Sequence, residues 1–225
     1  MKNVFLVIAF ILLVACTQEP SSPATPAPDP VPAEPVAQAP QKLTLFSSRA
    51  PAYTVDYAMK VSGPQEATGI LHVAAQEFAG TRYARIATTT TLTVNERTLQ
   101  TGVYFIDDKG YTCIKDKKWA CTELAPEQIE TAHSAPGSQQ AVEQSPELYN
   151  AQQTADRTIA GEQAHCFETS FEPAPGTTLQ TEYCYTADGI PLYIKTTSGE
   201  VTSEVTATNV KRIVEEKEFE IPALT

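Results

Sequence analysis

Apolar and polar residues alternate strictly between residues 53 and 61. The apolar positions of this stretch are Tyr53, Val55, Tyr57, Met59 and Val61. The positions between them are Thr54, Asp56, Ala58 and Lys60. Because successive side chains of a strand point to opposite faces, this alternation predicts a strand that is buried on one face only. Ser62-Gly63-Pro64 marks its end, since glycine and proline interrupt strands.

The same kind of pattern predicts five more strands before residue 125. They are expected at residues 68–75, 84–94, 99–105, 111–115 and 118–124. The stretch 84–94 places Ile86 and Leu92 on one face, and its run of threonines at 88–91 favours extended backbone because these residues are β-branched. Asn95-Glu96 is a predicted turn.

Four cysteines lie in two predicted hairpins. Folding residues 111–124 about Lys117 places Cys113 opposite Cys121, and folding residues 165–185 about Pro175 places Cys166 opposite Cys184. Directly opposed residues have Cβ atoms about 4.5–5.5 Å apart, close to what a disulfide requires. We therefore predict the disulfides Cys113–Cys121 and Cys166–Cys184, as is common in exported proteins. A metal site at the first pair is the alternative, but no further Cys or His lies nearby at a zinc-like spacing.

The period becomes helical between residues 126 and 153. Pro126 fits the first position of a helix, and Ser145-Pro146-Glu147 fits a second helix start with a serine cap. Gly137 interrupts the pattern between them. We expect two or three short helices here, packed on the sheet.

Strands resume after Cys184, at residues 191–197 and 201–214, and residues 219–222 are candidates for an edge strand. Together these elements predict a mainly β (α+β) fold. It would contain a strongly curved antiparallel sheet or half-open barrel of about 10–11 strands, with a few short helices inserted in the middle.

An apolar run occupies residues 4–14 and follows a single basic residue, Lys2. At ~1.5 Å per residue it spans about 16 Å, roughly half of a bilayer's hydrocarbon core. A positive start, a short apolar core and a small residue before the cleavage point are typical of a secretory signal peptide. The run therefore predicts that the chain is exported.

The end of this run, Leu13-Val14-Ala15-Cys16, resembles the lipobox of prokaryotic lipoproteins. The resemblance implies that residues 1–15 are removed as a signal peptide and that Cys16 carries a diacylglycerol. Two or more acyl chains hold a protein durably on a bilayer. The predicted location is the cell membrane or the outer membrane, with the lipid-anchored domain facing the periplasm or the cell exterior. The alternatives are ordinary secretion, with Cys16 a free thiol, and a retained membrane anchor.

Residues 16–42 are predicted to be the lipidated cysteine and a Pro-rich tether. Eight prolines lie between residues 17 and 41, with almost no large apolar residue. Such a composition cannot bury enough surface to offset the entropy of ordering, so we expect disorder. In polyproline II form, at ~3.1 Å per residue, the tether would reach roughly 75 Å. Residues 43–225 are then predicted to be a single β-rich extracytoplasmic domain.

The formal net charge of the chain is −11. An acidic surface disfavours nucleic acid and anionic lipid headgroups, so we predict no nucleic-acid partner. The histidines His72, His133 and His165 lie in no recognisable catalytic or metal-binding motif. No nucleophile elbow and no phosphate-binding glycine loop is present either. We predict no catalytic residue, no metal ligand and no cofactor, although residues that only the fold brings together would leave no such motif.

The succession of elements resembles the lipoprotein-carrier fold of LolA and LolB, of the LppX and LprG group, and of the sensor domain of RseB. The resemblance lies in the opening strand 53–61, the helical block 126–153 and the phrase Gly189-Ile190-Pro191-Leu192-Tyr193-Ile194. It implies a cavity between sheet and helices that holds acyl chains. The candidate lining residues are Val55, Tyr57, Met59, Ile86, Leu92, Val103, Phe105, Leu148 and Tyr149. The alternative is that these residues form a packed core only.

Three hypotheses for the function follow. The first is a membrane-anchored, non-enzymatic lipoprotein that binds or carries a lipid or another amphiphile in this cavity. The second is an interaction or sensor module that binds another envelope protein through its sheet. The third is an enzyme.

Overall fold

The computed structural model describes residues 50–77, 85–133, 142 and 147–222. The chain divides into one unit of residues 1–41 and a second, compact unit of residues 42–225, and all described residues belong to the second. The predicted signal peptide, the lipobox with Cys16 and the Pro-rich tether therefore lie outside the described residues and stay predictions.

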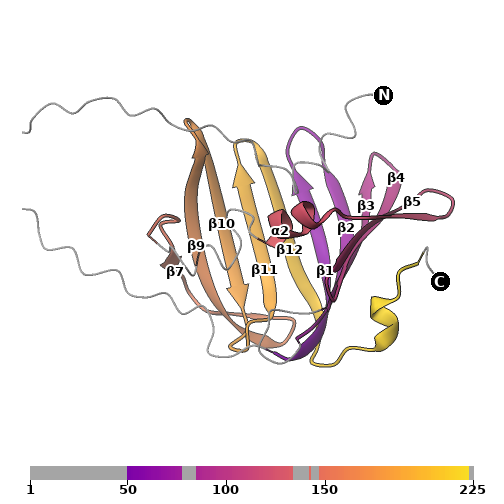
Figure 1. The fold of residues 1–225 in the computed structure, drawn as a ribbon. Coiled ribbons are helices and arrows are strands. Elements are labelled where there is room, and N and C mark those ends of the chain that lie inside the picture. Colours follow the sequence, from indigo (N-terminus) through magenta and orange to yellow (C-terminus); the bar gives the residue numbers. More distant parts are fainter. Residues whose placement is uncertain (1–49, 78–84, 134–141, 143–146, 223–225) are drawn as a thin grey trace, which may run out of the picture. The chain divides into compact units, whose positions relative to one another are not determined.

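One antiparallel sheet of 12 strands makes up most of the described domain, and it is not closed into a barrel. Its order is β6-β5-β4-β3-β2-β1-β12-β11-β10-β9-β7, and β8 pairs with β9 (Figure 1). The bounds are β1 Ala52–Ser62, β2 Ala67–Gln76, β3 Arg85–Val94, β4 Arg97–Ile106, β5 Lys109–Lys115, β6 Trp119–Glu123, β7 Gln152–Gln153, β8 Arg157–Ile159, β9 Glu162–Ala174, β10 Thr177–Tyr185, β11 Pro191–Ser198 and β12 Val201–Lys211. The sheet is thus two meanders, joined where the first strand pairs with the last.

The six strands predicted at the start of the domain are confirmed as β1 to β6, with ends that shift by a few residues. Asn95 and Glu96 form the predicted turn between β3 and β4, and both have left-handed backbone, with φ of 47° and 65°. Consecutive left-handed residues give the turn type whose twist matches a two-residue hairpin. The short strands β7 and β8 were not predicted, which accounts for the higher strand number.

The helical prediction for residues 126–153 is only partly correct. Helix α2 spans Pro126–His133 and begins at the predicted proline. The predicted interruption at Gly137 and the predicted helix start at Ser145-Pro146 lie outside the described residues. The helical prediction for Leu148 and its neighbours is wrong, because residues 147–150 form a turn and β7 follows. The backbone N–H of Ser170 on β9 donates to the Tyr149 carbonyl at 2.8 Å, so pairing with the sheet replaces helical hydrogen bonding here. No helix among the described residues is long and apolar enough to cross a bilayer.

The candidate edge strand at residues 219–222 is also wrong. The short helix η1, Glu216–Phe219, replaces it and lies against the sheet. Phe219 is buried there with Ala74, Ala87 and Tyr104. His72 on β2 holds the segment through Glu218 Oε2, 3.1 Å from its Nε2, while its Nδ1 lies 2.6 Å from Asp56 Oδ1. Burial of the Phe219 ring and the contact of His72 with Glu218 hold the segment in this conformation, and contacts between such distant residues leave no periodic signal in the sequence.

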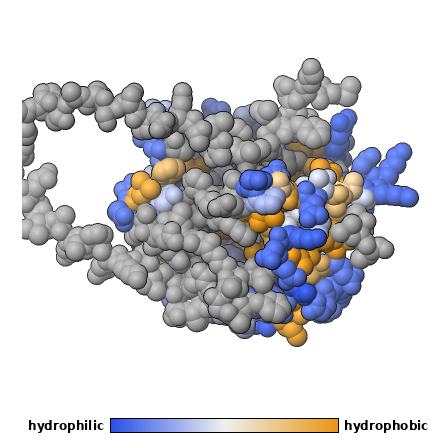
Figure 2. Space-filling model, in the orientation of Figure 1, coloured by the Kyte–Doolittle hydropathy of each residue, from blue (hydrophilic) through white to orange (hydrophobic). Residues whose placement is uncertain are grey.

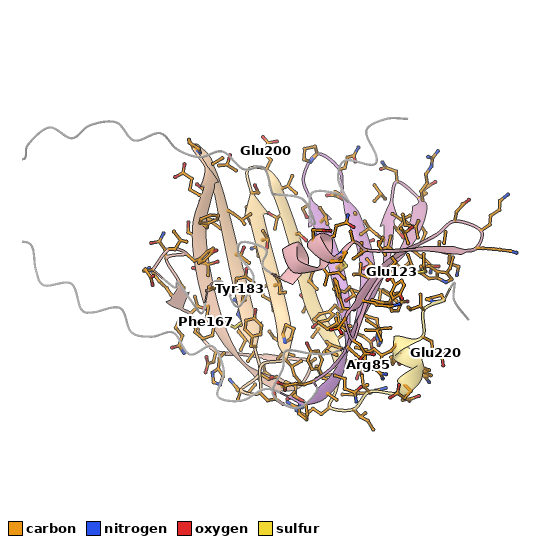
Figure 3. All side chains as sticks on the ribbon, in the orientation of Figure 1. Arg85, Glu123, Phe167, Tyr183, Glu200 and Glu220 are labelled. Carbon is orange, nitrogen blue, oxygen red and sulfur yellow. A yellow bond between two sulfur atoms is a disulfide. The ribbon has the colours of Figure 1, made fainter. Side chains whose placement is uncertain are left out.

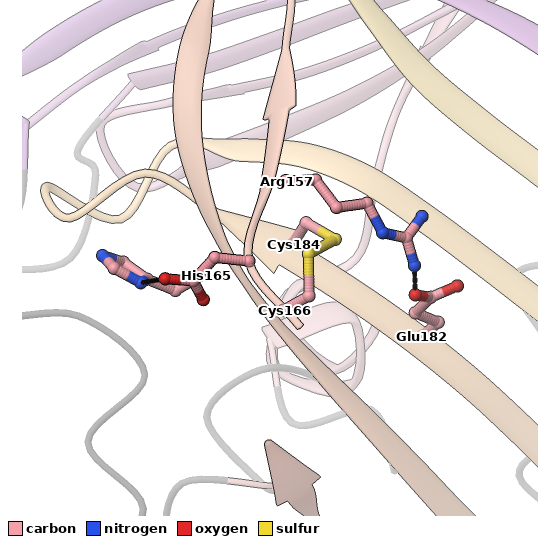
Figure 4. The surroundings of a disulfide bond; sticks show 6 residues. Arg157, His165, Cys166, Glu182 and Cys184 are labelled. Carbon is pink, nitrogen blue, oxygen red and sulfur yellow. Dashed lines mark hydrogen bonds and ion pairs between the residues drawn. A yellow bond between two sulfur atoms is a disulfide. The ribbon is translucent and has the colours of Figure 1, made fainter. Parts of the chain in front are cut away.

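Both predicted disulfides are formed. Cys113 pairs with Cys121 and Cys166 with Cys184, with Cα–Cα distances of 4.0 and 4.1 Å. Each bond joins residues that are directly opposed in the register of its hairpin. The second disulfide is fully buried between β9 and β10, and an ion pair of Arg157 with Glu182 lies beside it (Figure 4).

Arg212, directly after β12, ties together two distant parts of the domain. Its guanidinium donates to both carboxylate oxygens of Glu162, at 2.8 and 2.9 Å, and its Nε donates to Asp188 Oδ2 at 2.8 Å. The hydrogen bonds from Arg212 lower the pKa of Glu162. Burial opposes ionisation of Asp188, but hydrogen bonds from Arg212 and Thr186 outweigh it, so its pKa is lowered as well.

We expect Arg212→Met to lower the free energy of unfolding by about 1–2 kcal/mol at pH 7, because charge-assisted hydrogen bonds of a half-exposed group are lost. The two carboxylates have lowered pKa values in the fold, so the unfolded chain binds more protons than the folded chain in acid. Their contribution is present above about pH 5 and is lost as the pH falls toward about 3. Urea unfolding at several pH values should show the difference between wild type and variant shrinking in acid. A difference that stays constant over this range would contradict the assignment.

Candidate functional site

The two faces of the sheet differ sharply in character. Directly opposed residues of antiparallel strands share a face, so the register assigns every strand position to one of two faces. One row of opposed residues crosses the sheet from β9 to β4 as Phe167, Tyr183, Ile194, Val205, Met59, Gly69, Leu92 and Leu99. We call the face that carries this row the apolar face, and Figure 3 shows Phe167 and Tyr183 on it.

The neighbouring row contains the residue next to each of these positions, and it lies on the opposite face and carries charged side chains. It crosses from β9 to β1 as Glu168, Glu182, Lys195, Glu204 and Lys60. We call this face the charged face. Acidic and basic side chains stand opposite one another on it, which favours pairing across strands. A one-residue shift of register would exchange the two rows, so this contrast fixes the register.

Two further rows extend the apolar face over β1 to β5. The first is Tyr57, Leu71, Thr90, Thr101 and Ile114, and the second is Val55, Val73, Thr88, Val103 and Thr112. No Asp, Glu, Lys or Arg stands at any of these positions or in the apolar row above. Ile86 and Phe105, directly opposed, continue the apolar surface beyond them.

The apolar face is accessible over β2 to β5, and on β1 it is accessible at Met59. Val55 and Tyr57 on β1 are buried, whereas large side chains on the next three strands keep intermediate exposure. These are Leu71, Val73, Ile86, Leu92, Leu99, Val103 and Phe105. Figure 2 shows hydrophobic residues gathered next to α2. Side chains of this size that are neither buried nor fully exposed can still gain from contact with an apolar ligand.

Helix α2 approaches the apolar face at β5. A Cβ atom at Gly110 would lie 3.0 Å from Ile129 Cγ1 of α2 and 3.1 Å from Leu124 Cδ1. The missing side chain therefore lets α2 and the preceding loop lie directly on the strand. Gly110 stands opposite Phe105, so the helix borders the accessible part of the face.

Seven of the nine candidate lining residues share the apolar face. Val55, Tyr57 and Met59 come from β1, Ile86 and Leu92 from β3, and Val103 and Phe105 from β4. Ile86 stands directly opposite Phe105, and the pairing of Thr88 with Val103 puts Val103 beside them. The prediction that these residues line a cavity stays a prediction, and a packed core stays its alternative.

The remaining two candidates, Leu148 and Tyr149, separate from one another. Tyr149 is buried, and its ring lies 5.1 Å from that of Phe171, which stands on the apolar face of β9. Leu148 is 57% exposed. A helical spacing placed them together, whereas the turn at residues 147–150 turns only one of them toward the sheet.

Several residues of the apolar face were not predicted as site residues, among them Leu71, Val73 and the aromatic residues of β9 and β10. The alternation within residues 68–75 already contains Leu71 and Val73, and only the choice of face was missing. Phe167 and Tyr183 lie in a predicted hairpin, yet nothing within that hairpin shows which face of the sheet they share. Pairing of β1 with β12 supplies that link.

Charged and titratable groups gather on the charged face. His72 lies there between Asp56 and Glu218, and the pKa of Asp56 is lowered by hydrogen bonds from Asn209 and His72. His165, near the start of β9, stands two residues before Phe167 and therefore on the apolar face instead, where it pairs with Asp156 at 3.0 Å. The side chain of His133 lies outside the described part of the chain. The described residues contain no group of three or more His, Cys, Asp or Glu side chains that could hold a metal ion.

In the three rows of the apolar face the ionisable groups are phenols. Burial raises the pKa of Tyr57, whose hydroxyl donates to the Pro191 carbonyl at 2.8 Å. Burial also raises the pKa of Tyr183. Both groups stay neutral at physiological pH, so these rows offer apolar contact and hydrogen bonds rather than charge.

No protein-family model and no curated protein matches the sequence. Solved structures with a similar arrangement include the Pseudomonas aeruginosa MucA/MucB complex, at 12% identity and a TM-score of 0.49. The match covers 76% of this chain and 56% of the other, so this chain spans little more than half of that one.

Two further similar structures belong to the groups named by the sequence resemblance. The lipoprotein LppX of Mycobacterium tuberculosis is 12% identical with a TM-score of 0.42, over 72% of this chain and 88% of LppX. A LolA-superfamily protein of Nitrosomonas europaea is 11% identical with a TM-score of 0.37, over 76% and 90% of the two chains. The function therefore has to be inferred from the residues of this chain.

Proposed function

We propose that the protein is a membrane-anchored extracytoplasmic lipoprotein, without enzymatic activity, that binds the apolar part of a lipid or another amphiphile on its apolar face. The observation that carries this proposal is the contrast between the two faces. Large apolar side chains on β2 to β4 keep intermediate exposure in rows that contain no charged residue, while the opposite face is charged.

Contact with an acyl chain would remove from water both the acyl chain and the apolar side chains that it covers. Each buried methylene contributes about 0.8 kcal/mol, so roughly ten methylenes supply about 8 kcal/mol before the entropic costs of binding. A charged headgroup would find no counter-charge at the positions of the apolar rows. It would have to remain at the rim, where water solvates it.

The anchor and the tether come from the sequence. A lipidated Cys16 would hold the chain on the cell membrane or the outer membrane, and residues 16–42 would separate the anchor from the domain at 43–225. The domain would then face the periplasm or the cell exterior, within reach of membrane lipids. A tether of roughly 75 Å would let the apolar face move between the membrane surface and partners at a distance.

The alternative proposal is an envelope interaction or sensor module that binds another protein through its sheet. It is favoured by β6, which ends the described sheet and pairs only with β5. An edge strand can accept an additional strand from a partner. Lys115 and Lys117 stand exposed at the adjoining turn and would favour an acidic partner segment.

The lipid proposal is tested by placing a charge on the apolar face. Leu92→Asp introduces a carboxylate in the middle of that face, and we expect it to reduce co-purifying lipid at least tenfold, because a buried charge without a partner is costly. Thr93→Asp, the next residue on β3 but on the charged face, is the matched control and should keep its lipid. The measurement is native mass spectrometry of residues 42–225, the unit that contains all described residues, exported into an oxidising compartment.

Equal lipid content in both variants would contradict the proposal. Thermal melts of both proteins establish that they remain folded. If neither they nor the wild type carries or takes up lipid, the alternative is tested next by charge reversal at Lys115 and Lys117.

A further inference from the structure

Four threonines form a polar cluster within the apolar face. Thr90 on β3 stands directly opposite Thr101 on β4, and Thr88 lies two residues before Thr90 on the same face. Thr112 on β5 stands opposite Val103, which places it diagonally beside Thr101. We call Thr88, Thr90, Thr101 and Thr112 the threonine cluster. All four keep intermediate exposure.

The threonine cluster is surrounded by apolar side chains. Leu71 and Val73 on β2 stand opposite Thr90 and Thr88. Leu92 flanks the cluster on one side, and Ile86 flanks it on the other. The cluster is therefore a patch of hydroxyl groups surrounded by the apolar side chains of the proposed binding face.

Within the described part of the chain, no hydrogen bond joins these four hydroxyls to another residue. On the charged face of the same strands, Thr91 and Thr93 do have partners, whereas no hydrogen bond joins the Thr89 hydroxyl to another described residue. Thr93 Oγ1 lies 3.3 Å from Thr98 Oγ1, and Gln100 Nε2 donates to Thr91 Oγ1 at 3.4 Å. The cluster thus presents donors that are available to a ligand.

A ligand that covers these hydroxyls must satisfy them. Burying a hydroxyl without a hydrogen bond costs about 1–3 kcal/mol, so a plain hydrocarbon chain would bind poorly across the cluster. A carboxylate or phosphate would also accept hydrogen bonds from the cluster. However, no cationic side chain stands in the row of Leu92 on one side of the cluster or in the row of Ile86 on the other, so the negative charge would have no partner there. An uncharged oxygen acceptor fits both conditions.

We infer that the threonine cluster is a polar subsite that donates hydrogen bonds to an ester group of the bound lipid. The protein would therefore bind lipids that contain acyl esters more tightly than hydrocarbons without oxygen. This inference rests on the proposed function, since it takes the apolar face as the binding surface. Beyond that function, it assigns the ester oxygens of the ligand to a defined place on the apolar face, the threonine cluster.

The test replaces hydroxyl by methyl without a change of shape. Thr90→Val together with Thr101→Val removes the cross-strand pair of donors and keeps β-branched residues in the strands. The probes are 1,2-dioleoylglycerol, which carries two esters, and squalene, a hydrocarbon without oxygen. Native mass spectrometry of residues 42–225 titrated with each probe gives the two affinities.

We expect the double valine variant to bind dioleoylglycerol at least tenfold more weakly and squalene no more weakly than the wild type. Thr89→Val with Thr91→Val is the matched control, on the same strand but on the charged face, and it should bind both probes as the wild type does. Thr90→Ser with Thr101→Ser keeps the hydroxyls and should retain dioleoylglycerol binding.

A double valine variant that binds dioleoylglycerol as tightly as the wild type would overturn the subsite and leave the proposed function intact. A wild type that binds neither probe would overturn the proposed function itself. If the double variant does not fold, Thr88→Val with Thr112→Val provides an independent pair from the same cluster with the same expected result.

Discussion

Leu192→Ala is expected to lower the free energy of unfolding by about 2–5 kcal/mol, a larger loss than we expect from Arg212→Met. Leu192 on β11 is 0% exposed and packs in the main cluster of buried residues with Val55, Ile190 and Ala207. Truncation leaves a cavity, because the surrounding strands are held in register by β10 and β12 on either side.

The strands around Leu192 cannot easily move together to fill the cavity. Pro191, the preceding residue, accepts the hydrogen bond from the buried Tyr57 hydroxyl, which fixes β11 relative to β1. Urea unfolding of residues 42–225 measures the loss. Ile70→Ala is the control, since Ile70 is 62% exposed and its truncation should change stability by less than about 0.5 kcal/mol. A loss below about 1 kcal/mol for Leu192→Ala would show that this cluster is not the packed core.

Replacing both Cys166 and Cys184 with alanine is expected to cost about 3 kcal/mol of stability. The two residues are 18 positions apart, and the bond restricts the unfolded chain by closing this loop. It also joins β9 to β10, the strands that carry Phe167 and Tyr183 of the apolar row.

The matched control uses a chain in which Cys113 and Cys121 are already alanine. In that background a reductant should destabilise the protein that keeps Cys166 and Cys184, and it should leave the variant without them unchanged. Thiol counting under denaturing, non-reducing conditions adds a direct check. If all four cysteines of the domain reacted as free thiols, both disulfide assignments would be wrong.

The sequence predicted most of the sheet because the evidence for each strand is local. The alternation at Tyr53, Val55 and Tyr57 identifies a strand and its buried face without knowledge of its neighbours. The hairpin fold that places Cys166 opposite Cys184 is equally local, and this pairing is present in the register.

The errors fall where distant contacts decide. Residues 147–153 have helical spacing, but pairing of Gln152 and Gln153 with β9 gives them a turn and a short strand. Phe219 was expected in an edge strand, and instead its burial against Ala74 and Tyr104 places it in η1. In both segments a tertiary contact outweighs a weak local preference.

The candidate site was only half predictable. Ile86, Leu92, Val103 and Phe105 could be chosen as candidates because each alternates within its own strand. The threonine cluster could not be found in this way, because Thr90, Thr101 and Thr112 come from three strands and become neighbours only through the register. The lack of charge in the apolar rows likewise emerges only when positions from eight strands are set side by side.

Binding of an amphiphile to the apolar face is tested by the native mass spectrum of the exported wild-type unit 42–225, followed by extraction of any bound lipid. We expect an added mass at near-stoichiometric level, and acyl lipid in the extract. A clean apo mass that persists after incubation with added dioleoylglycerol would contradict this binding, and the apolar face would then be no more than part of the core.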